Sequence, residues 1–322
     1  MRVAVTGGSG VVGHAVVRHL VGRGDEVWAL ARSEDSAEQL DWMGCRVVAG
    51  DLLDFDAVSR LVKGAETVFH VAGVNEMCSL DPARMWRVNV EGTTGVLDAA
   101  SRVGVGRIVH TSSAATIGEA HGAVGSETSP HRGFFLSEYE RSKTVAERLI
   151  LHTDRDIEVV SVNPSSVQGP GRATGTGALL LLAAQGRLPF LVDATFSIVD
   201  IDDCARAHLA AADRGESGQR YVVSGHVTTV REAVRHLSMN DPGSPRPWFL
   251  RPEVVSAAAE VAGPVSKLFG RRPVLCPESA RVLLNGHSYD GSRAERDLGI
   301  VYTPLDETFA RTLKWFVDEG LL

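Results

Sequence analysis

Thr6-Gly7-Gly8-Ser9-Gly10-Val11-Val12-Gly13 follows the apolar run Arg2–Thr6 and leads into an amphipathic stretch at Val11–Arg23. Gly7 can make a tight turn, Gly10 lets the backbone approach a pyrophosphate, and Gly13 lets a helix pack closely on the strand. The helix N-terminus would supply free N–H donors and a positive dipole. The stretch therefore predicts a dinucleotide site, against the alternative of a structural glycine turn, with these cofactor-binding residues: Gly7, Ser9, Gly10, Val11, Val12 and Gly13.

The first half of the chain continues to alternate short apolar runs with amphipathic stretches. After the first strand and helix, the expected elements are Glu26–Ala31, Ser36–Met43, Arg46–Ala49, Ala57–Lys63, Thr67–Val71, Pro82–Val103, Arg107–Thr111, Ser137–His152 and Glu158–Val162. Continuous apolar strands need helices on both faces of the sheet, and right-handed crossovers then give a doubly wound topology. We therefore expect an α/β fold with a Rossmann-type doubly wound parallel sheet.

The second half has a different pattern, in which Gly- and Pro-rich loops surround short helices. Two further strands are expected at Ser197–Ile201 and Arg220–Val223, where the chain would return to the sheet. Final helices are expected at Glu253–Phe269, Pro277–Leu284 and Leu305–Glu319. The predicted core is residues 1–165 with 197–226 returning to it, and residues 166–196 and 227–322 would form a smaller, interleaved C-terminal substrate-binding lobe.

Composition and charge favour a soluble enzyme of the cytoplasm. The 322 residues are 44% hydrophobic and 23% charged, with a net charge of −7 and no long basic run, so neither nucleic acid nor a membrane is an expected partner. The longest apolar stretch, Ala178–Ala184, is far shorter than the roughly 20 residues that span a bilayer. Cys45, Cys78, Cys204 and Cys276 are scattered, and we expect thiols in a reducing compartment, with neither disulfide nor metal site.

The end of the second expected strand bears on which dinucleotide binds. An acid there would accept hydrogen bonds from the ribose hydroxyls of NAD, whereas an arginine can pair with the extra phosphate of NADP. The positions hold Ala31 and Arg32, which favours NADP and leaves NAD possible. After the third strand, Asp51 could bond the adenine amino group with Leu52 beside it, or could instead cap a helix.

Tyr139-Glu140-Arg141-Ser142-Lys143 lies in an expected helix, where a spacing of four residues puts Tyr139 and Lys143 on one face. A nearby ammonium stabilises a phenolate and brings its pKa towards the working range. Ser113 ends the fifth strand, at the sheet edge where ligands bind, and could donate to a substrate oxygen; Ser112 is the competing candidate. The pattern predicts Ser113, Tyr139 and Lys143 as catalytic residues.

These motifs give the chain a resemblance to the extended short-chain dehydrogenase/reductases. The matching segments, in order, are TGGSGVVG (6–13), DLLD (51–54), FHVAG (69–73), NVEGTTGVLDAA (89–100), TSSAAT (111–116), YERSK (139–143), NPSSVQGPG (163–171) and SYDGSRAERDLG (288–299). Within that family, VWALAR (27–32), SSAAT (112–116) and IVDIDDCARAH (198–208) look most like the dihydroflavonol reductase, 3β-hydroxysteroid dehydrogenase and hopanoid-associated epimerase branches.

The resemblance implies a Ser113–Tyr139–Lys143 triad. It also implies further residues that line the cofactor: Ala72, Gly73, Asn89, Ser112, Pro164 and Ser166. In relatives, the helices that correspond to Pro82–Val103 and Ser137–His152 pair between subunits, so a homodimer is expected. Nucleotide-sugar dehydratases of the family carry an acidic pair where this chain has Ala114 and Ala115, which argues against dehydration.

Three features bear on the substrate. Many sugar epimerases of the family place an arginine just before the strand at 196–201, and none precedes it closely here; Asp200 stands where relatives have histidine. Arg172 and Arg187 could bind a carboxylate or phosphate, or could be solvated loop residues. An apolar ketone or aldehyde would suit the candidate pocket residues, which could equally be core: Met77, Phe134, Phe135, Leu136, Leu179, Leu182 and Phe190.

The sequence thus predicts an NADP(H)-dependent oxidoreductase, a ketone or aldehyde reductase or an alcohol dehydrogenase, for a fairly apolar small molecule. One alternative is an NAD-dependent sugar epimerase of the same family. Another is a non-catalytic dinucleotide-sensing protein, although such proteins typically lose the tyrosine and lysine that this chain keeps.

Overall fold

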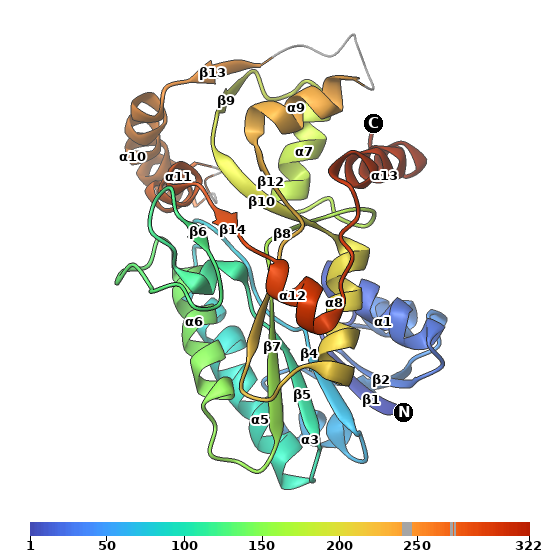
Figure 1. Ribbon diagram of the computed structural model, residues 1–322. Coiled ribbons are helices and arrows are strands. Elements are labelled where there is room, and N and C mark those ends of the chain that lie inside the picture. The colour runs from blue at the N-terminus through green and yellow to red at the C-terminus, as the bar shows by residue number, and fades with distance from the viewer. Residues whose placement is uncertain (240–246, 271–272, 274) are drawn as a thin grey trace.

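A seven-stranded sheet forms the centre of the lower part of the molecule in Figure 1. The computed structural model describes residues 1–239, 247–270, 273 and 275–322. Every neighbouring pair in the sheet is parallel, in the order β11-β7-β5-β4-β1-β2-β3. The strands are β1 (Arg2–Thr6), β2 (Glu26–Ala31), β3 (Arg46–Ala49), β4 (Thr67–His70), β5 (Arg107–Thr111), β7 (Glu158–Pro164) and β11 (Arg220–Val223).

Helices cover both faces of this sheet. Successive residues of a strand point to opposite faces, so one strand contributes to two apolar clusters. Val3 and Val5 of β1 belong to one apolar cluster and Ala4 belongs to the other. The first cluster joins the sheet to α1 (Val11–Gly22) and α8 (Ile201–Arg214), and the second joins it to α3 (Phe55–Val62), α5 (Gly92–Arg102) and α6 (Glu138–Leu151). The helix α2 (Glu34–Trp42) also lies in this half. The predicted doubly wound fold is confirmed.

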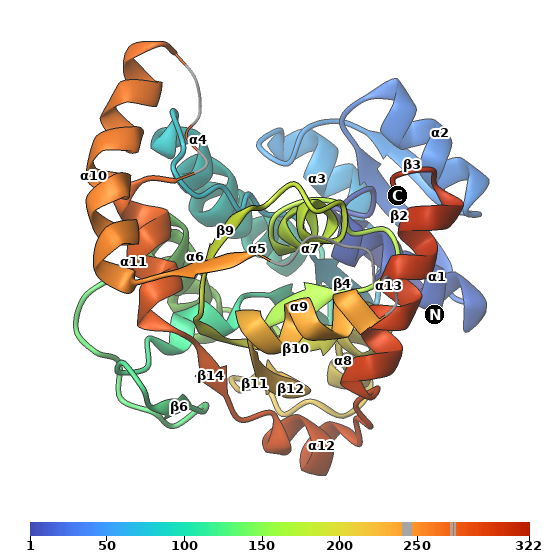
Figure 2. The same cartoon turned by 90° about the horizontal axis from the view of Figure 1, so that it is seen from above.

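Beyond the main sheet and its helices, the described residues form small sheets and further helices, which Figure 2 shows from above; one of them, α12 (Ser292–Leu298), packs against α8 and β11. The strands of the small sheets pair in the sets β12-β10-β8, β13-β9 and β14-β6. The strands are β6 (Val124–Gly125), β8 (Ser166–Gln168), β9 (Phe190–Val192), β10 (Thr195–Asp200), β12 (His226–Thr229), β13 (Trp248–Leu250) and β14 (Ser288–Tyr289). The helices are α7 (Thr176–Ala184), α9 (Val230–Met239), α10 (Pro252–Leu268), α11 (Pro277–Asn285), α12 (Ser292–Leu298) and α13 (Leu305–Asp318).

Two predicted elements differ from the structure. The strand expected at Ser197–Ile201 does not return to the main sheet: β10 pairs parallel with β8 and antiparallel with β12. The physical reason is its apolar partner, since Ile198 packs with Phe309 in the core of the upper part. The helix expected over 82–103 is three pieces, α4 (Pro82–Trp86), a π-helical turn at Arg87–Glu91, and α5. Among the described residues, no helix meets the length and hydropathy that a membrane span requires.

The expectation of free thiols is wrong for two of the four cysteines. Cys78 and Cys276 form a disulfide, while Cys45 and Cys204 are free and buried. The two bonded residues are 198 positions apart, so only the fold brings them together, and no spacing pattern in the chain signals the pair. The disulfide joins the loop after β4 to Cys276, the residue that directly precedes α11.

Candidate active site

The glycine turn lies between β1 and α1, at the carboxyl edge of the sheet. Gly7 has φ +73°, and a β-carbon there would lie 2.6 Å from the backbone of Ala72 in the loop after β4. A β-carbon on Gly13 would lie 2.0 Å from the carbonyl oxygen of Gly7. Gly7 and Gly13 are therefore required by close backbone packing, as predicted for the turn and for the helix.

The N-terminus of α1 is open to an anion. Gly10 is its N-cap residue and offers no side-chain cap, the first turn contains no acid, and Ser9 and Gly10 are exposed. Val11 and Val12 begin the helix and are partly buried. Uncapped N–H groups and the positive end of the helix dipole are the features that bind a pyrophosphate. This end of the helix therefore fits a dinucleotide.

The end of β2 has the arrangement that the sequence predicts. Ala31 is buried, while the Arg32 side chain is 69% exposed, with its guanidinium 4.0 Å from the Asp51 carboxylate. Asp51 accepts a hydrogen bond from Leu53 N, whereas Asp54 is the N-cap residue of α3. Asp51 is therefore not a helix cap, which was its alternative role. An exposed arginine with only a distant partner is free to reach a phosphate.

Tyr139 lies in the first turn of α6, whose N-cap is Ser137. The Ser113 side chain lies beside the Tyr139 hydroxyl, and Ser113 follows β5 by two residues as the N-cap of a 3₁₀ turn at Ala114–Ile117. The pKa of Tyr139 is raised, chiefly by burial, and the Ser113 hydroxyl and the charge of Arg172 only partly oppose the rise, so the lowering expected from a nearby ammonium is not found. Ser113 is therefore beside the phenol, while Ser112 is buried with no hydrogen-bond partner for its hydroxyl among the described residues.

Lys143 is one helical turn beyond Tyr139 and is buried. Its Nζ donates to the Thr111 carbonyl oxygen at the end of β5, with an N···O distance of 2.6 Å. Burial lowers the pKa of Lys143 to about 8, and the nearby Glu147 carboxylate opposes this shift. The structure therefore brings Ser113, Tyr139 and Lys143 together at the carboxyl edge of β5, where the sequence predicts them.

Asn89 holds the loop after β4 against α6. Its Oδ1 accepts from Val74 N at 2.7 Å, and its Nδ2 donates to Val74 O and to Ser142 Oγ, both at 2.9 Å. A β-carbon on Gly73 would lie 3.3 Å from Lys143 Nζ and 3.4 Å from Asn89 Oδ1. Asn89 sits in the π-helical turn, a feature that frequently marks functional sites. These hydrogen bonds give Asn89 a structural role beside Lys143.

The other predicted cofactor-lining residues lie around the same edge. Ala72 packs against Gly7, and Pro164 ends β7. Ser166 begins β8, where its hydroxyl contacts Thr176 Oγ1 at 2.8 Å. Leu52 lies under α5, because a β-carbon on Gly92 would come within 2.6 Å of it.

Sequence reasoning missed the buried histidines of β4 and β5. His70 contacts Thr6 Oγ1 at 2.7 Å and Thr93 Oγ1 at 2.9 Å, and its ring centroid is 5.3 Å from that of His110. Burial, followed by the charge of Lys143, lowers the pKa of His70 to about 3 and that of His110 well below its usual value. Both rings are therefore neutral. Both histidines lie in otherwise apolar strands, and no pattern in the sequence marks them as candidate site residues.

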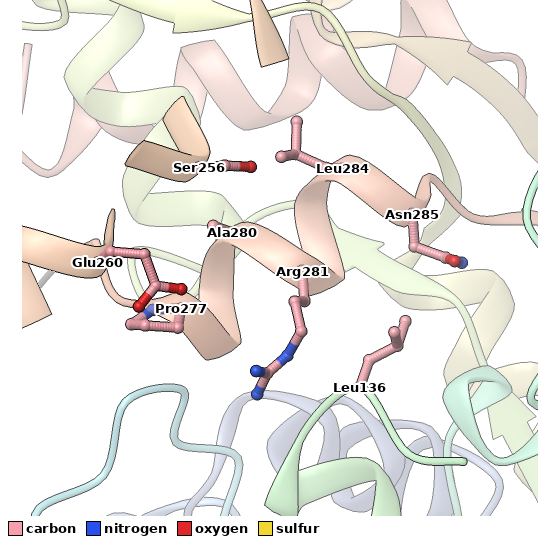
Figure 3. A pocket seen from close by; sticks show the side chains of 8 residues that line it. All are labelled: Leu136, Ser256, Glu260, Pro277, Ala280, Arg281, Leu284 and Asn285. Carbon is pink, nitrogen blue, oxygen red and sulfur yellow. The ribbon is translucent and has the colours of Figure 1, made fainter. Parts of the chain in front are cut away.

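A cavity of about 310 Å³ lies between α10, α11 and the segment before α6 (Figure 3). Of the predicted pocket residues it contains only Leu136; Phe134, Phe135, Leu179 and Phe190 are exposed. The lining residues are Leu136, Ser256, Glu260, Pro277, Ala280, Arg281, Leu284 and Asn285.

The cavity wall is tied to α6, the helix that carries Tyr139 and Lys143. The Glu278 carboxylate on α11 accepts from Glu138 N at 2.8 Å and from Cys78 N at 2.7 Å. One acid therefore joins α11 to the start of α6 and to the loop after β4. The helices α10 and α11 were predicted, but their contribution to a cavity was not.

Asp200 has a structural explanation. Its carboxylate caps α8 by accepting from Asp202 N at 2.8 Å, and it accepts from Thr308 Oγ1 of α13 at 2.9 Å. Arg311 Nη1 also lies 3.4 Å from it. Asp200 therefore fastens α13 to the carboxyl end of β10 rather than facing the active site.

An uncapped helix at a glycine turn, over a parallel sheet with a partly buried tyrosine and a buried lysine beside it, defines a dinucleotide-dependent enzyme of the Rossmann type. Residues 3–224 match the model of the NAD dependent epimerase/dehydratase family, and the chain belongs to this family.

Relatives extend over the whole chain. Sterol demethylase protein B of Methylococcus capsulatus is 32% identical over 329 residues, covering 100% of both chains. A 2-alkyl-3-oxoalkanoate reductase of Stenotrophomonas maltophilia is 32% identical over 331 residues, covering 98% of each. The crystal structure of gox2253 superposes with a TM-score of 0.86 and 29% identity, covering 100% of this chain and 99% of the other.

These relatives confirm the predicted class of enzyme. Others carry names from the branches that the sequence resembles, a putative dihydroflavonol 4-reductase and a 3 beta-hydroxysteroid dehydrogenase. The chain is an NAD(P)-dependent oxidoreductase of the extended short-chain dehydrogenase/reductase type.

Proposed function

We propose that the protein transfers a hydride between NADP(H) and the carbon of a ketone, aldehyde or alcohol on a fairly apolar small molecule. The observation that carries the proposal is the contact between Ser113 and Tyr139, one helical turn from the buried Lys143 ammonium. Two hydroxyls and a cation at one sheet edge suit a reaction that creates or removes an alkoxide.

The dinucleotide supplies or accepts the hydride when it is bound. In the direction of reduction, Ser113 donates a hydrogen bond to the carbonyl oxygen, and Tyr139 transfers its proton to that oxygen as negative charge develops there. Lys143 holds a positive charge beside the resulting phenolate and can bind the nicotinamide ribose. Because burial raises the pKa of Tyr139, the phenol is protonated at neutral pH and is ready to act as the acid.

The preference for NADP rests on the end of β2. Arg32 is exposed there, and no acid occupies the buried position of Ala31. A guanidinium pairs with a phosphate through two parallel hydrogen bonds, which a ribose hydroxyl does not offer.

The choice of an apolar substrate rests on the segment before α6 and on the upper part of the molecule. Phe134 and Phe190 are 60% and 58% exposed, and Leu136 reaches the cavity of Figure 3. Residues 166–196 and 227–322 would form the substrate-binding lobe. The relatives named for a sterol and for an oxoalkanoate point to the same class of molecule.

Titration of the purified protein with NADPH and NADH, followed by a panel of ketones, aldehydes and alcohols monitored by nicotinamide absorbance, tests the proposal. We expect tighter binding of NADPH and turnover of an apolar carbonyl or alcohol. NAD that stays bound through purification would instead indicate an epimerase. Tight NADPH binding with no turnover of any compound would indicate a dinucleotide sensor.

We also propose a homodimer that pairs α5 and α6 with their copies, as in relatives of the family. Light scattering from the purified protein, with a molar mass of twice the 34.4 kDa of one chain, would support it, and the mass of a monomer would contradict it.

A further inference from the structure

Arg172 is held by its own loop, between β8 and α7. The loop turns back after Gly169, whose carbonyl oxygen accepts from Arg172 N at 3.3 Å. A β-carbon on Gly177 would lie 2.7 Å from Arg172 Cγ, and one on Gly175 would lie 3.2 Å from Nη2. The absence of side chains at these two glycines leaves room for the arginine, so the loop fixes the position of the guanidinium.

The guanidinium has no partner of its own. Its Nε is buried without a hydrogen-bond partner, and no hydrogen bond or ion pair joins its Nη atoms to any residue that the structure describes. Arg172 is partly buried, with its Nε shielded from solvent, and a cation that is partly removed from water is normally paired with a carboxylate. Arg187, in the same part of the molecule, is by contrast exposed and contacts Gln185 Oε1 at 3.4 Å.

Arg172 also lies close to the reacting groups. Its charge lowers the pKa of Tyr139, and it acts in the same way on the buried thiol of Cys204. Cys204 does not neutralise it, because burial raises the pKa of that thiol to about 12. The guanidinium is thus an unpaired positive charge beside the phenol that the proposed reaction uses.

We infer that Arg172 binds an anionic group of the substrate, a carboxylate carried close to the reacting carbon, so that the substrates are hydroxy or oxo acids with an apolar chain. The inference rests on the proposed function, which identifies the carbon that reacts, and it adds a carboxylate close to that carbon. A single guanidinium matches a carboxylate in two parallel hydrogen bonds, whereas a diphosphate normally receives several cations. The carboxylate supplies the counter-ion that no described residue provides.

The test compares molecules that differ only in charge. Binding of 3-hydroxy acids of increasing chain length, of their methyl esters and of UDP-glucose is measured by calorimetry on the NADP⁺-loaded protein, and oxidation of each is followed by nicotinamide absorbance. The variants are Arg172→Met and Arg172→Lys, with Arg187→Met as the matched control. NADPH affinity and Tm show that each variant is folded and still binds its cofactor.

We expect the wild type to bind an acid about 10- to 100-fold more tightly than its ester, as for a hydrogen bond to a charged group. Arg172→Met should remove this preference, Arg172→Lys should keep part of it, and Arg187→Met should leave it unchanged. Equal binding of acid and ester by the wild type, a preference that survives in Arg172→Met, or Arg172-dependent binding of UDP-glucose but not of the acids would overturn the inference.

The two proposals fail in different ways. An acid that binds through Arg172 but is not oxidised, with no other alcohol or ketone turned over, would refute the proposed function and leave the anion site standing. Turnover of esters or simple alcohols at least as fast as of the acids, in wild type and Arg172→Met alike, would refute the anion site and leave the proposed function standing.

Discussion

Replacement of Lys143 by methionine is expected to stabilise the protein while it abolishes the proposed activity. Lys143 is buried, and burial lowers the pKa of its ammonium from 10.5 to about 8. At neutral pH the folded protein therefore keeps a charge that the surrounding structure disfavours. Methionine has a similar length and carries no charge, so it should fill the same space without this cost.

The pKa shift gives the size of the effect. At about 1.36 kcal/mol per pKa unit, a change from 10.5 to about 8 corresponds to about 3 kcal/mol of lost stability at pH 7. The bond from Lys143 Nζ to the Thr111 carbonyl oxygen is lost in the variant, which costs about 1 kcal/mol. The free energy of unfolding of Lys143→Met should therefore exceed that of the wild type by about 2 kcal/mol.

The sign of the pH dependence follows from linkage. Between the folded pKa of about 8 and the unfolded value of 10.5, the unfolded wild type binds more protons than the folded one, so wild-type stability rises with pH in that window. The advantage of Lys143→Met should be constant below about pH 8 and shrink as the pH rises towards 10.5.

Denaturant unfolding of both proteins without cofactor, at several pH values, measures this difference. Lys314→Met is the control, because the Lys314 side chain is 76% exposed and its replacement should change stability by less than about 0.5 kcal/mol. A Lys143→Met protein less stable than the wild type at pH 7, or a difference that does not change up to pH 10, would refute the reasoning.

Three further substitutions test other parts of the molecule. Gly7→Ala places a β-carbon 2.6 Å from the backbone of Ala72 in a residue with φ +73°, and it should lower the unfolding free energy by about 2–4 kcal/mol. Gly24 has φ +86° and nothing within 4 Å of an added β-carbon, so Gly24→Ala should lower the unfolding free energy by about 1 kcal/mol. Equal effects of the two substitutions would contradict the packing argument. Arg32→Ala should weaken NADPH binding about 10- to 100-fold in fluorescence titrations and leave the affinity for NADH unchanged. An equal loss of affinity for both cofactors would show that Arg32 does not bind the extra phosphate. Replacing Cys78 and Cys276 by serine should lower the unfolding free energy by about 2–4 kcal/mol, an effect that dithiothreitol should reproduce in the wild type; no effect of either would show that the bridge is not formed in solution.

The sequence predicted those parts of the fold and site that depend on local chemistry. The glycines at 7, 10 and 13 are recognisable because a turn beside a helix N-terminus needs them at that spacing. Tyr139 and Lys143 could be paired because a helix places residues four apart on one face, and Ser113 because strand ends meet at one sheet edge. In each case a short segment determines the geometry.

The features that the sequence did not reveal depend on contacts between distant segments. β10 was expected in the main sheet, but its partner Phe309 lies more than a hundred positions later in the chain. Cys78 and Cys276 meet only after α11 packs beside the loop that follows β4. Arg172 appeared as one of two loop arginines, and only the structure distinguishes its partly buried side chain, without a partner among the described residues, from the exposed side chain of Arg187.

Single-turnover hydride transfer in Tyr139→Phe tests the central claim most directly. The substitution removes one oxygen and leaves Ser113 and Lys143 in place, and it should lower the rate about 10²- to 10⁴-fold, the usual contribution of general acid–base catalysis, with NADPH affinity unchanged. The measurement uses a carbonyl compound that the wild type reduces, mixed with NADPH-loaded protein. A wild-type rate in this variant would contradict the assignment of Tyr139 as the proton donor.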